Sequence, residues 1–424
     1  MIFLLLSCAP VSIVDTVTPS ISEEEQQEDT PDTPDVIDTG DDDIDVVVGD
    51  GGGGEAWIYD PTVLHTLELT LDDESVSTLQ SQTEAYSAEI VYVSADMVYD
   101  GESLGEVGLR IKGRWGSWRS LSQKSSFKLD FNRYVDGQKF HGLKSMTLNN
   151  MVIDCSYMRE HIAYQVYRAG GSPAPRTAYT RISVNGTDYG LYLNVESVDD
   201  VFLDRHFDDS SGNMYDADYI LWDDGSYTVL DFYPNLVKYF DQEEGKEGDR
   251  SDLMTLSQLL DQVEGSPDAY EDTAEAVDWP AHRRLMANEL WTGQIDGYSL
   301  NRNNYLAYFH KGQVVVLPWD HDYAFIEPGD WGFSWAYPQG RLSSLCINDD
   351  ECRDELMVDL QAVLDVVDLL DVPNIIDDTA DWLADEIRTD PRRECSDGYI
   401  TYYQDVLRGW AATRSSDLER QWGL

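Results

Sequence analysis

The sequence predicts an α+β fold with two lobes that meet near residue 196. Short stretches that alternate apolar and polar residues, as half-buried strands do, dominate residues 56–196. Beyond them the apolar residues recur mainly at helical spacing, around one further hairpin. The chain has 424 residues, of which 42% are hydrophobic, which is enough for a large core.

The first lobe, residues 56–196, is expected to be rich in strands. Asp154 or Ser156 can cap a helix, and Asn185-Gly186 supplies the positive φ that a tight hairpin turn needs. The expected elements are strands at 67–71, 88–94, 106–112 and 125–131, short helices at about 72–82 and 156–169, and a hairpin at 180–184 and 190–195.

The second lobe, residues 197–335, is followed by a helical C-terminal extension, residues 336–424, in which no chemistry is indicated. Residues 215–247 are rich in Tyr and Asp, and their pattern does not decide between helix, strand and loop. The expected elements are a hairpin at 304–309 and 313–317 and helices at 197–206, 251–263, 279–292, 353–371, 376–388 and 398–420.

The N-terminus has the features of an export signal. Leu5-Leu6-Ser7-Cys8 matches the pattern that is cut before the lipid-modified cysteine of bacterial lipoproteins. The apolar run before Cys8 is shorter than the roughly 7–15 residues of a signal peptide, so we expect the true start to lie upstream. Residues 9–55 are acidic and predict a disordered linker. We therefore expect an exported bacterial lipoprotein, in the outer membrane, periplasm or cell surface, that meets the membrane only through its lipid anchor.

Cysteine usage agrees with export. Besides Cys8 the chain has four cysteines, and an even number in an exported protein suggests two disulfides. Cys346 and Cys352 are close in sequence, in a stretch expected to be a short loop, and we predict that they pair. That pairing would leave Cys155 with Cys395.

Net charge limits the possible partners. The chain carries a formal charge of −52 at pH 7, which repels a phosphate backbone and argues against nucleic-acid binding. An anionic nucleotide would need a local basic pocket or a metal ion. The scarce basic residues cluster: Arg110 is the first Lys or Arg of the chain, and others follow closely. This cluster is either an anion pocket or a surface hairpin paired with acidic neighbours; it comprises Arg110, Lys112, Arg114, Arg119, Lys124, Lys128 and Arg133.

Residues 296–322 hold the densest group of polar side chains. Asp320 and Asp322 follow an apolar strand, and Asp296 and Asn301 lie in the loop before that hairpin. Oxygen ligands of this kind suit Mg²⁺ or Mn²⁺. The Asp-x-x-x-x-Asn spacing also matches the catalytic loop of protein kinases, although the same residues can serve as turn-formers and strand caps. His321 is either a metal ligand or a structural group.

Several short segments within residues 57–330 together form a recognisable series of motifs, in a fixed order along the chain. They are Gly108–Gly113, Lys124–Leu129, Gly142–Asn150, Asp154, Met158–Glu160, Val184–Tyr192, Glu196, Val198-Asp199, Asp296–Tyr305 and Pro318–Asp322. With these segments the chain resembles the spore coat protein H (CotH) kinase family. The family commonly has a Leu or Tyr between the two aspartates that follow Pro-Trp, where this chain has His321.

The resemblance implies a two-lobed, atypical protein-kinase-like fold that binds ATP and a divalent metal and phosphorylates serine on proteins. Asp296 would be the catalytic aspartate. Asn301, or else Asn303 or Asn304, would bind the metal with Asp320, for which Asp322 is the rival. The nucleotide-binding set would be Lys112, Lys124, Lys128, Glu160 and Glu196, in which Lys124 or Lys128 contacts phosphates, Glu160 orients that lysine, and Glu196 meets the adenine through its backbone.

Two other functions fit the sequence. A non-catalytic surface binding or adhesion module could use the same fold. Such a module would not need four metal-binding side chains close to one point; here these would be Asp296, Asn301, Asp320 and Asp322. A phosphotransferase with a sugar or small-molecule acceptor is the other alternative. In the leading hypothesis the protein is an exported, monomeric kinase that transfers the γ-phosphoryl group of ATP to Ser or Thr of a protein substrate.

Overall fold

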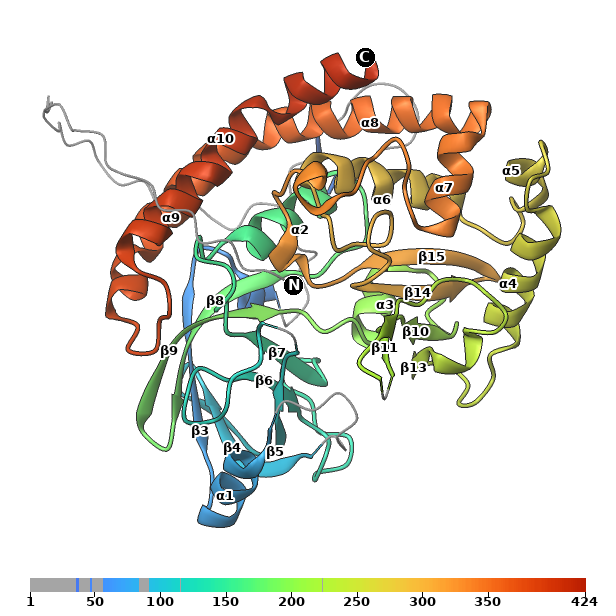
Figure 1. Cartoon of the computed structure of the whole chain (residues 1–424). Helices are drawn as coiled ribbons and strands as arrows, with labels where there is room; N and C mark the ends of the chain where they lie inside the picture. The colour runs from blue at the N-terminus through green and yellow to red at the C-terminus, as the bar shows by residue number, and fades with distance from the viewer. Residues whose placement is uncertain (1–35, 38–45, 48–55, 84–90, 115, 223) are drawn as a thin grey trace, which may run out of the picture. The chain divides into compact units, whose positions relative to one another are not determined.

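The computed structural model describes residues 36–37, 46–47, 56–83, 91–114, 116–222 and 224–424 (Figure 1). The expected signal at 1–8, with Cys8, lies outside the described residues. Within the expected linker, β1 (Val36–Ile37) and β2 (Val46–Val47) are described, and they pair antiparallel. The described residues from Val36 onward belong to one compact unit.

A closed β-barrel forms the N-terminal region, with strand order β3-β4-β5-β6-β7-β9-β8. Neighbouring strands run antiparallel except β3 and β8, whose parallel pairing closes the barrel and leaves no open edge. A 3₁₀ turn, η1 (Ala56–Tyr59), precedes it. The strands are β3 (Leu64–Thr70), β4 (Val93–Tyr99), β5 (Glu102–Lys112), β6 (Ser126–Asp130), β7 (Ser145–Asn149), β8 (Thr177–Val184) and β9 (Thr187–Val195).

Most of the expected strands are confirmed, and the hairpin turn between β8 and β9 has the predicted left-handed Asn185 and Gly186, at φ 49° and 71°. Of the strand expected at 88–94, residues 88–90 lie outside the described residues, and β4 begins at Val93. Strand β7 was not predicted. Helix α1 (Asp73–Ser81) follows β3 as expected.

The two faces of β8 and β9 belong to different cores. Ile182 and Tyr192 point into the barrel core, whereas Tyr179, Leu191 and Leu193 pack with the helices outside it. Helix α2 (Arg159–Ala169) is almost wholly buried in that second core. The helix starts later than predicted, and its N-cap is Met158, which makes no side-chain cap hydrogen bond, so neither Asp154 nor Ser156 is the cap. Asp154 still contacts the start of the helix, because the backbone N–H of Arg159 donates to its Oδ2 at 2.8 Å.

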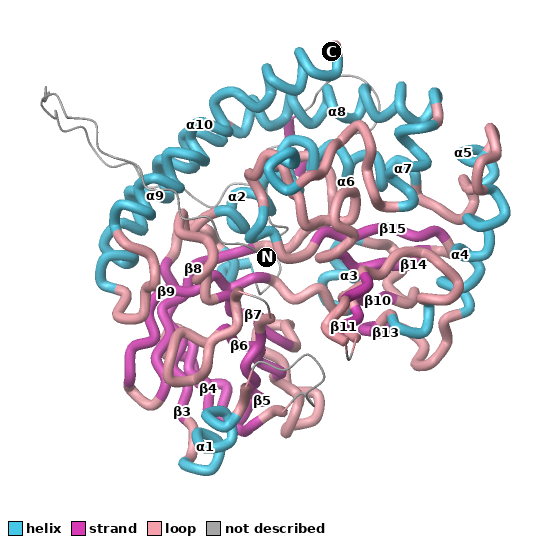
Figure 2. Tube along the Cα trace, viewed as in Figure 1, coloured by secondary structure: helices cyan, strands magenta, loops and turns pink. Residues whose placement is uncertain are grey.

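The central part of the C-terminal region is a sheet in the order β13-β10-β14-β15 with helices around it (Figure 2). The predicted hairpin is β14 (Tyr305–His310) and β15 (Gln313–Pro318). The other elements are α3 (Asp200–His206), β10 (Met214–Asp216), β11 (Ile220–Leu221), β12 (Tyr227–Thr228), η2 (Val237–Tyr239), β13 (Asp241–Glu244), α4 (Ser251–Val263), α5 (Ala269–Asp272), α6 (Trp279–Thr292), η3 (His321–Tyr323) and η4 (Pro328–Trp331).

The C-terminal extension is helical as predicted and reaches back to the barrel, because α9 contacts both β9 and α2 while α10 packs on α9, α8 and α6 (Figure 1). None of the helices described in the chain is long and apolar enough to cross a membrane. The extension contains α7 (Arg341–Asn348), α8 (Asp350–Leu370), α9 (Val372–Thr389) and α10 (Asp397–Trp422).

Both predicted disulfides are present. Cys155, just before α2, pairs with Cys395, just before α10, and Cys346 pairs with Cys352. The expectation that the second pair lies in a loop was wrong. Cys346 belongs to α7 and Cys352 to α8, and Asp349 between them caps α8 by accepting a hydrogen bond from the backbone of Cys352.

Candidate active site

Asp296 lies in the loop between α6 and β14, and three asparagines of that loop hold its carboxylate. Asn301 Nδ2 donates to Oδ1 at 2.5 Å, while Asn303 and Asn304 donate to Oδ2 at 3.2 and 2.9 Å. Burial raises the pKa of Asp296 to about 6, and the Asn301 hydrogen bond works against that rise. The carboxylate is therefore fixed in orientation and ionised at neutral pH.

Asp320 follows β15 in a left-handed conformation, with φ at 49°, which a non-glycine residue adopts only when its surroundings hold it there. Its N–H donates to Tyr164 Oη at 3.1 Å, and its carbonyl accepts from Gln294 Nε2 at 3.1 Å and Asn304 Nδ2 at 3.3 Å. Asn304 thus joins the Asp296 carboxylate to the Asp320 backbone.

Asp322 is the second carboxylate of this loop. Its pKa is raised well above the ordinary value, first by burial and then by the charges of Asp320, Glu160 and Asp296. Burial also raises the pKa of Asp320, which Lys112 lowers. The carboxyl groups of the Asp296 loop, of the loop after β15 and of Glu160 on α2 therefore interact unfavourably with one another. A bound cation would relieve this repulsion.

His321 turns away from its two neighbours into the protein. Its ring packs against Tyr164 and Tyr167 of α2, with centroid distances of 4.8 and 4.5 Å, and it is 1% exposed. Burial lowers the pKa of His321 to about 3, so the ring is neutral. Of the two interpretations of His321, the structural one fits this packing.

Glu160 stands in the first turn of α2, and Lys112 ends β5. Burial and the Asp320 charge raise the pKa of Glu160, while burial lowers that of Lys112 and the charges of Asp320 and Glu160 oppose the fall. Asn149 lies between the two: Lys112 Nζ donates to its Oδ1, and its Nδ2 donates to Glu160 Oε2 at 2.7 Å.

Lys128 lies on β6 opposite Arg110 of β5, on the same face of the barrel as Lys112. Its Nζ donates to Thr147 Oγ1 at 3.1 Å and to Ser197 Oγ at 2.5 Å. Burial lowers the pKa of Lys128 to about 8, against the charge of Asp199. Three cations of adjacent strands thus face the C-terminal region.

The comparison with protein families agrees with this geometry. The family model described as CotH kinase protein matches residues 109–418, more than half of the chain. The chain belongs to the CotH kinase family. The match begins at β5 and ends within α10, so it includes the C-terminal extension as well as the site.

Two curated relatives share this family's name. The chain is 25% identical over 206 residues to the inner spore coat protein H of Bacillus subtilis (strain 168), covering 47% of this chain and 54% of the relative. It is 29% identical over 79 residues to an inner spore coat protein H-like protein of the same organism, covering 19% and 24%. The chain thus spans about half or less of the length of the curated relatives it matches.

One solved structure shows a weak likeness. It is that of the Shewanella oneidensis MR-1 toxin–antitoxin system HipA, HipB and its operator DNA complex. The TM-score is 0.31 and the identity 12%, with 73% of this chain and 68% of that chain covered. A likeness at this level carries no argument about this CotH kinase family member.

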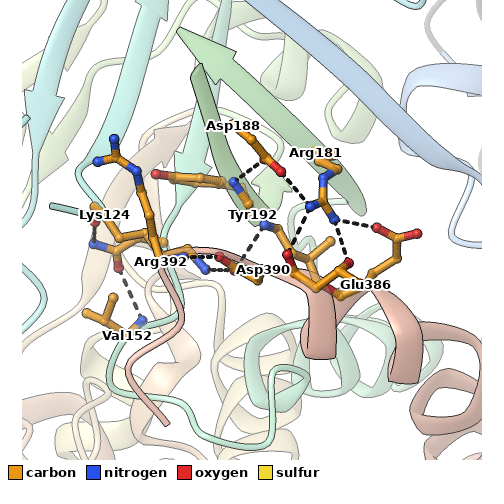
Figure 3. Close-up of polar contacts among 12 residues, drawn as sticks. Lys124, Val152, Arg181, Asp188, Tyr192, Glu386, Asp390 and Arg392 are labelled. Carbon is orange, nitrogen blue, oxygen red and sulfur yellow. Dashed lines mark hydrogen bonds and ion pairs between the residues drawn. The ribbon is translucent and has the colours of Figure 1, made fainter. Parts of the chain in front are cut away.

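Within this family member, the structure does not bring Lys124 to the site. Lys124 precedes β6, is 1% exposed, and its Nζ lies 2.5 Å from Asp390 Oδ2 of the C-terminal extension (Figure 3). Asp390 compensates its charge inside the protein, so Lys124 is not placed to contact phosphates. Of the two lysines predicted for that role, Lys128 is the one that faces the C-terminal region.

Glu196 is also engaged elsewhere. Its carboxylate pairs with Arg176, 2.7 Å away, and with Arg205, and these cations lower its pKa although burial raises it. Its backbone N–H donates to the Arg176 carbonyl at 2.9 Å. That N–H is therefore already used within the protein, and the contact of the Glu196 backbone with adenine stays a prediction.

The sequence did not single out Asn149, Arg159 and Tyr164 as site residues. Arg159 Nη1 donates to the Asp322 carbonyl at 3.3 Å, and Tyr164 receives the Asp320 N–H. Asn149 and Arg159 lie in segments that carry the family resemblance, so a signal was present for both. Tyr164 has the pattern of an ordinary helix residue, since its partner Asp320 lies 156 positions away in the chain.

Oxygen-bearing side chains of this site are the kind that a divalent metal ion takes. In residues 56–83, 91–114, 116–222 and 224–424, no three His, Cys, Asp or Glu side chains are already grouped closely enough to hold one. Mg²⁺, however, commonly takes one or two carboxylates together with substrate phosphates. Asp320 and Asp322, crowded by like charge and rich in oxygen, fit that manner of binding.

Proposed function

We propose that this protein is a kinase that transfers the γ-phosphoryl group of ATP to a Ser or Thr hydroxyl of another protein, with Mg²⁺ or Mn²⁺. One observation carries the proposal: Asn304 joins the Asp296 carboxylate to the Asp320 backbone, and Asn149 joins Lys112 to Glu160. The charge of Asp320 acts on both Lys112 and Glu160, which agrees with a single site. Membership of the CotH kinase family supports ATP as the donor.

Asp320 and Asp322 would hold the metal. Asn301 could add its amide oxygen, because its amide nitrogen is already used on Asp296. A divalent ion at this point supplies neutralisation of the phosphate charge that builds up during phosphoryl transfer. In its absence the mutual repulsion of Asp320 and Asp322 remains, and this repulsion favours cation binding.

Asp296 would accept the proton of the attacking hydroxyl. A base with a pKa of about 6 is ionised at neutral pH and still basic enough to receive a proton. The three asparagine amides fix its orientation, so little rearrangement is needed when an acceptor arrives. Lys112 and Lys128 would contact the phosphates from the barrel side, since ammonium groups pair well with phosphate oxygens.

We further propose that the protein is exported and anchored by a lipid on Cys8. The two disulfides support export, because disulfides persist mainly in oxidising compartments. Incorporation of labelled fatty acid into the full chain, lost in Cys8→Ala, tests the anchor. Equal labelling of both forms, or labelling of neither, would remove Cys8 from the proposal.

Transfer is tested with the full chain, γ-labelled ATP and Mn²⁺ or Mg²⁺, with extracts of the producing cell as the acceptor source. The proposal expects labelled phosphoserine or phosphothreonine, absent with Asp296→Asn. Label found only on sugars or small molecules would keep the phosphotransferase and replace the acceptor.

A non-catalytic binding module is the second candidate. The lack of a ready three-ligand group among the described side chains favours it. This module would be folded and stable yet would bind no nucleotide with either metal. Nucleotide binding therefore separates the two functions.

A further inference from the structure

Asn149 connects the two charged groups that are expected to organise the nucleotide. It is the last residue of β7, and its side-chain amide spans the space between Lys112 Nζ and Glu160 Oε2. Lys112 and Glu160 both lie in the described part of the chain, and no ion pair within 4 Å joins them directly. The connection between lysine and glutamate therefore runs through a neutral amide.

The register of the barrel explains this placement. Lys112 of β5 stands opposite Ser126 of β6, and Phe127, the next residue, stands opposite Leu148 of β7. Asn149 thus continues the row from Lys112 across Ser126. Because Ser126 is small, the long lysine side chain can pass over it and reach the third strand, where adjacent strands lie about 4.8 Å apart.

The orientation of the amide follows from the chemistry of its partners. A lysine ammonium can only donate hydrogen bonds, so it takes the amide oxygen. The amide nitrogen is left to donate to the carboxylate of Glu160. Among side chains of this size, asparagine offers both an acceptor for Lys112 and a donor for Glu160. Aspartate lacks the donor, and leucine lacks both groups.

A neutral link has a consequence for the lysine. In a direct ion pair, the carboxylate would compensate much of the ammonium charge at the position where phosphate should bind. An amide fixes the position of Lys112 without cancelling its charge. The residual charge is then available to an anion, while the amide keeps Glu160 in place beside Asp320.

We propose that Asn149 is a positioning residue that aims Lys112 at the nucleotide phosphates and holds Glu160 through the same amide. This inference rests on the proposed function for the role of Lys112. It adds a residue that acts through Lys112 and Glu160 and does not itself touch the reacting atoms.

The test combines nucleotide binding with stability in the free protein. Affinity for a non-hydrolysable ATP analogue with Mn²⁺ is measured calorimetrically for the full chain, Asn149→Leu, Lys112→Met and the double variant. We expect each single change to weaken binding about tenfold or more, as loss of a hydrogen bond to a charged group does. The double variant should lose little beyond either single change, because both disrupt one unit.

Urea midpoints of the same four proteins, without metal or nucleotide, give a readout independent of the kinase function. The shifts should be non-additive if Lys112 and Asn149 depend on each other. Asn149→Asp keeps the size and the acceptor for Lys112 but repels Glu160, so it should also weaken binding. Asn132→Leu, at an exposed position in the turn after β6, is the matched control and should bind like the wild type.

The outcomes are distinguishable. If the wild type binds the analogue and Asn149→Leu and Asn149→Asp bind equally well, the positioning role is wrong. Additive losses in the double variant would also overturn it, since the two residues would then act separately. If the folded wild type binds no analogue, the proposed function itself fails, and the role of Asn149 toward phosphate fails with it.

Discussion

Lys124 and Asp390 form a buried ion pair between residues 266 positions apart in the chain, with Nζ 2.5 Å from Oδ2. The two side chains are 1% and 0% exposed. Asp390 Oδ2 also accepts the backbone N–H of Leu191 on β9, at 3.1 Å (Figure 3). The segment between α9 and α10 thus ties the C-terminal extension to the barrel, and a lysine that resembles a phosphate ligand in sequence serves this connection.

Further contacts strengthen the connection. Arg392 lies over the Tyr189 ring, with its guanidinium carbon 3.5 Å from the ring centroid, and donates to the Leu121 carbonyl. Arg181 of β8 pairs with Glu386 of α9 at 2.7 Å (Figure 3). The Cys155–Cys395 disulfide adds a covalent link next to the start of α2. The extension therefore helps to set the position of α2, the helix that carries Glu160.

Removing Asp390 should be costly. Asp390→Ala leaves a buried, uncompensated lysine, and breaking a buried pair in this way typically costs about 3–5 kcal/mol. Urea unfolding of the full chain measures the loss. Asp417→Ala, which removes a more exposed partner of Arg420, is the control and should cost at most about 1 kcal/mol. Equal losses in both variants would contradict the structural role of Asp390.

The two disulfides should contribute unequally. Cys155 and Cys395 close a loop of 240 residues, and Cys346 and Cys352 one of 6. The chain-entropy model gives about 5 kcal/mol for the long loop and about 2 kcal/mol for the short one. Unfolding free energies of Cys155→Ser with Cys395→Ser, and of Cys346→Ser with Cys352→Ser, should follow that order. The reverse order would show that strain or residual structure outweighs loop length.

Glu289 should make stability depend on pH. Burial raises its pKa to about 7, although the Ser299 N–H donates to the carboxylate. Because the folded pKa lies above the unfolded one, the protonated form favours folding. Its contribution is present below about pH 4.5 and is lost as the pH rises through 7. The unfolding free energy of Glu289→Gln minus that of the wild type should therefore be larger at pH 8 than at pH 5. An unchanged difference between the two proteins would contradict this.

Asp296→Asn tests the proposed base separately from nucleotide binding. The substitution keeps the size of the side chain but removes the proton acceptor, and loss of general-base catalysis costs about 10²–10⁴-fold in rate. We expect phosphotransfer to fall within that range while affinity for ATP with Mn²⁺ stays close to the wild-type value. Transfer at the wild-type rate by the folded variant would remove Asp296 from the catalytic role.

Local patterns predicted much of the secondary structure. Helices α4 and α6 have the predicted bounds. In the structure, Asp278 caps α6 by accepting a hydrogen bond from the Ala281 N–H, and a proline stands in its first turn. The Asp296 loop was predicted for a similar reason, since the asparagines that hold its carboxylate lie within eight positions of it.

Contacts distant in sequence account for most of what was missed. The parallel pairing of β3 with β8 and the placement of β7 between β6 and β9 depend on partners far along the chain. The choice between Lys124 and Lys128 depends on Asp390, and the environment of Glu196 on Arg176 and Arg205. A sequence pattern places a lysine near a strand but does not say which acidic residue it will meet.

The most direct test of the central claim is metal-dependent nucleotide binding by the full chain. The melting temperature is measured with ATP and Mn²⁺ or Mg²⁺, for the wild type and Asp320→Ala side by side. A ligand that binds only the folded state raises the melting temperature. We expect a rise in melting temperature that requires both ATP and metal and that is absent in Asp320→Ala. No rise in the folded wild type with either metal, or an equal rise in Asp320→Ala, would contradict it.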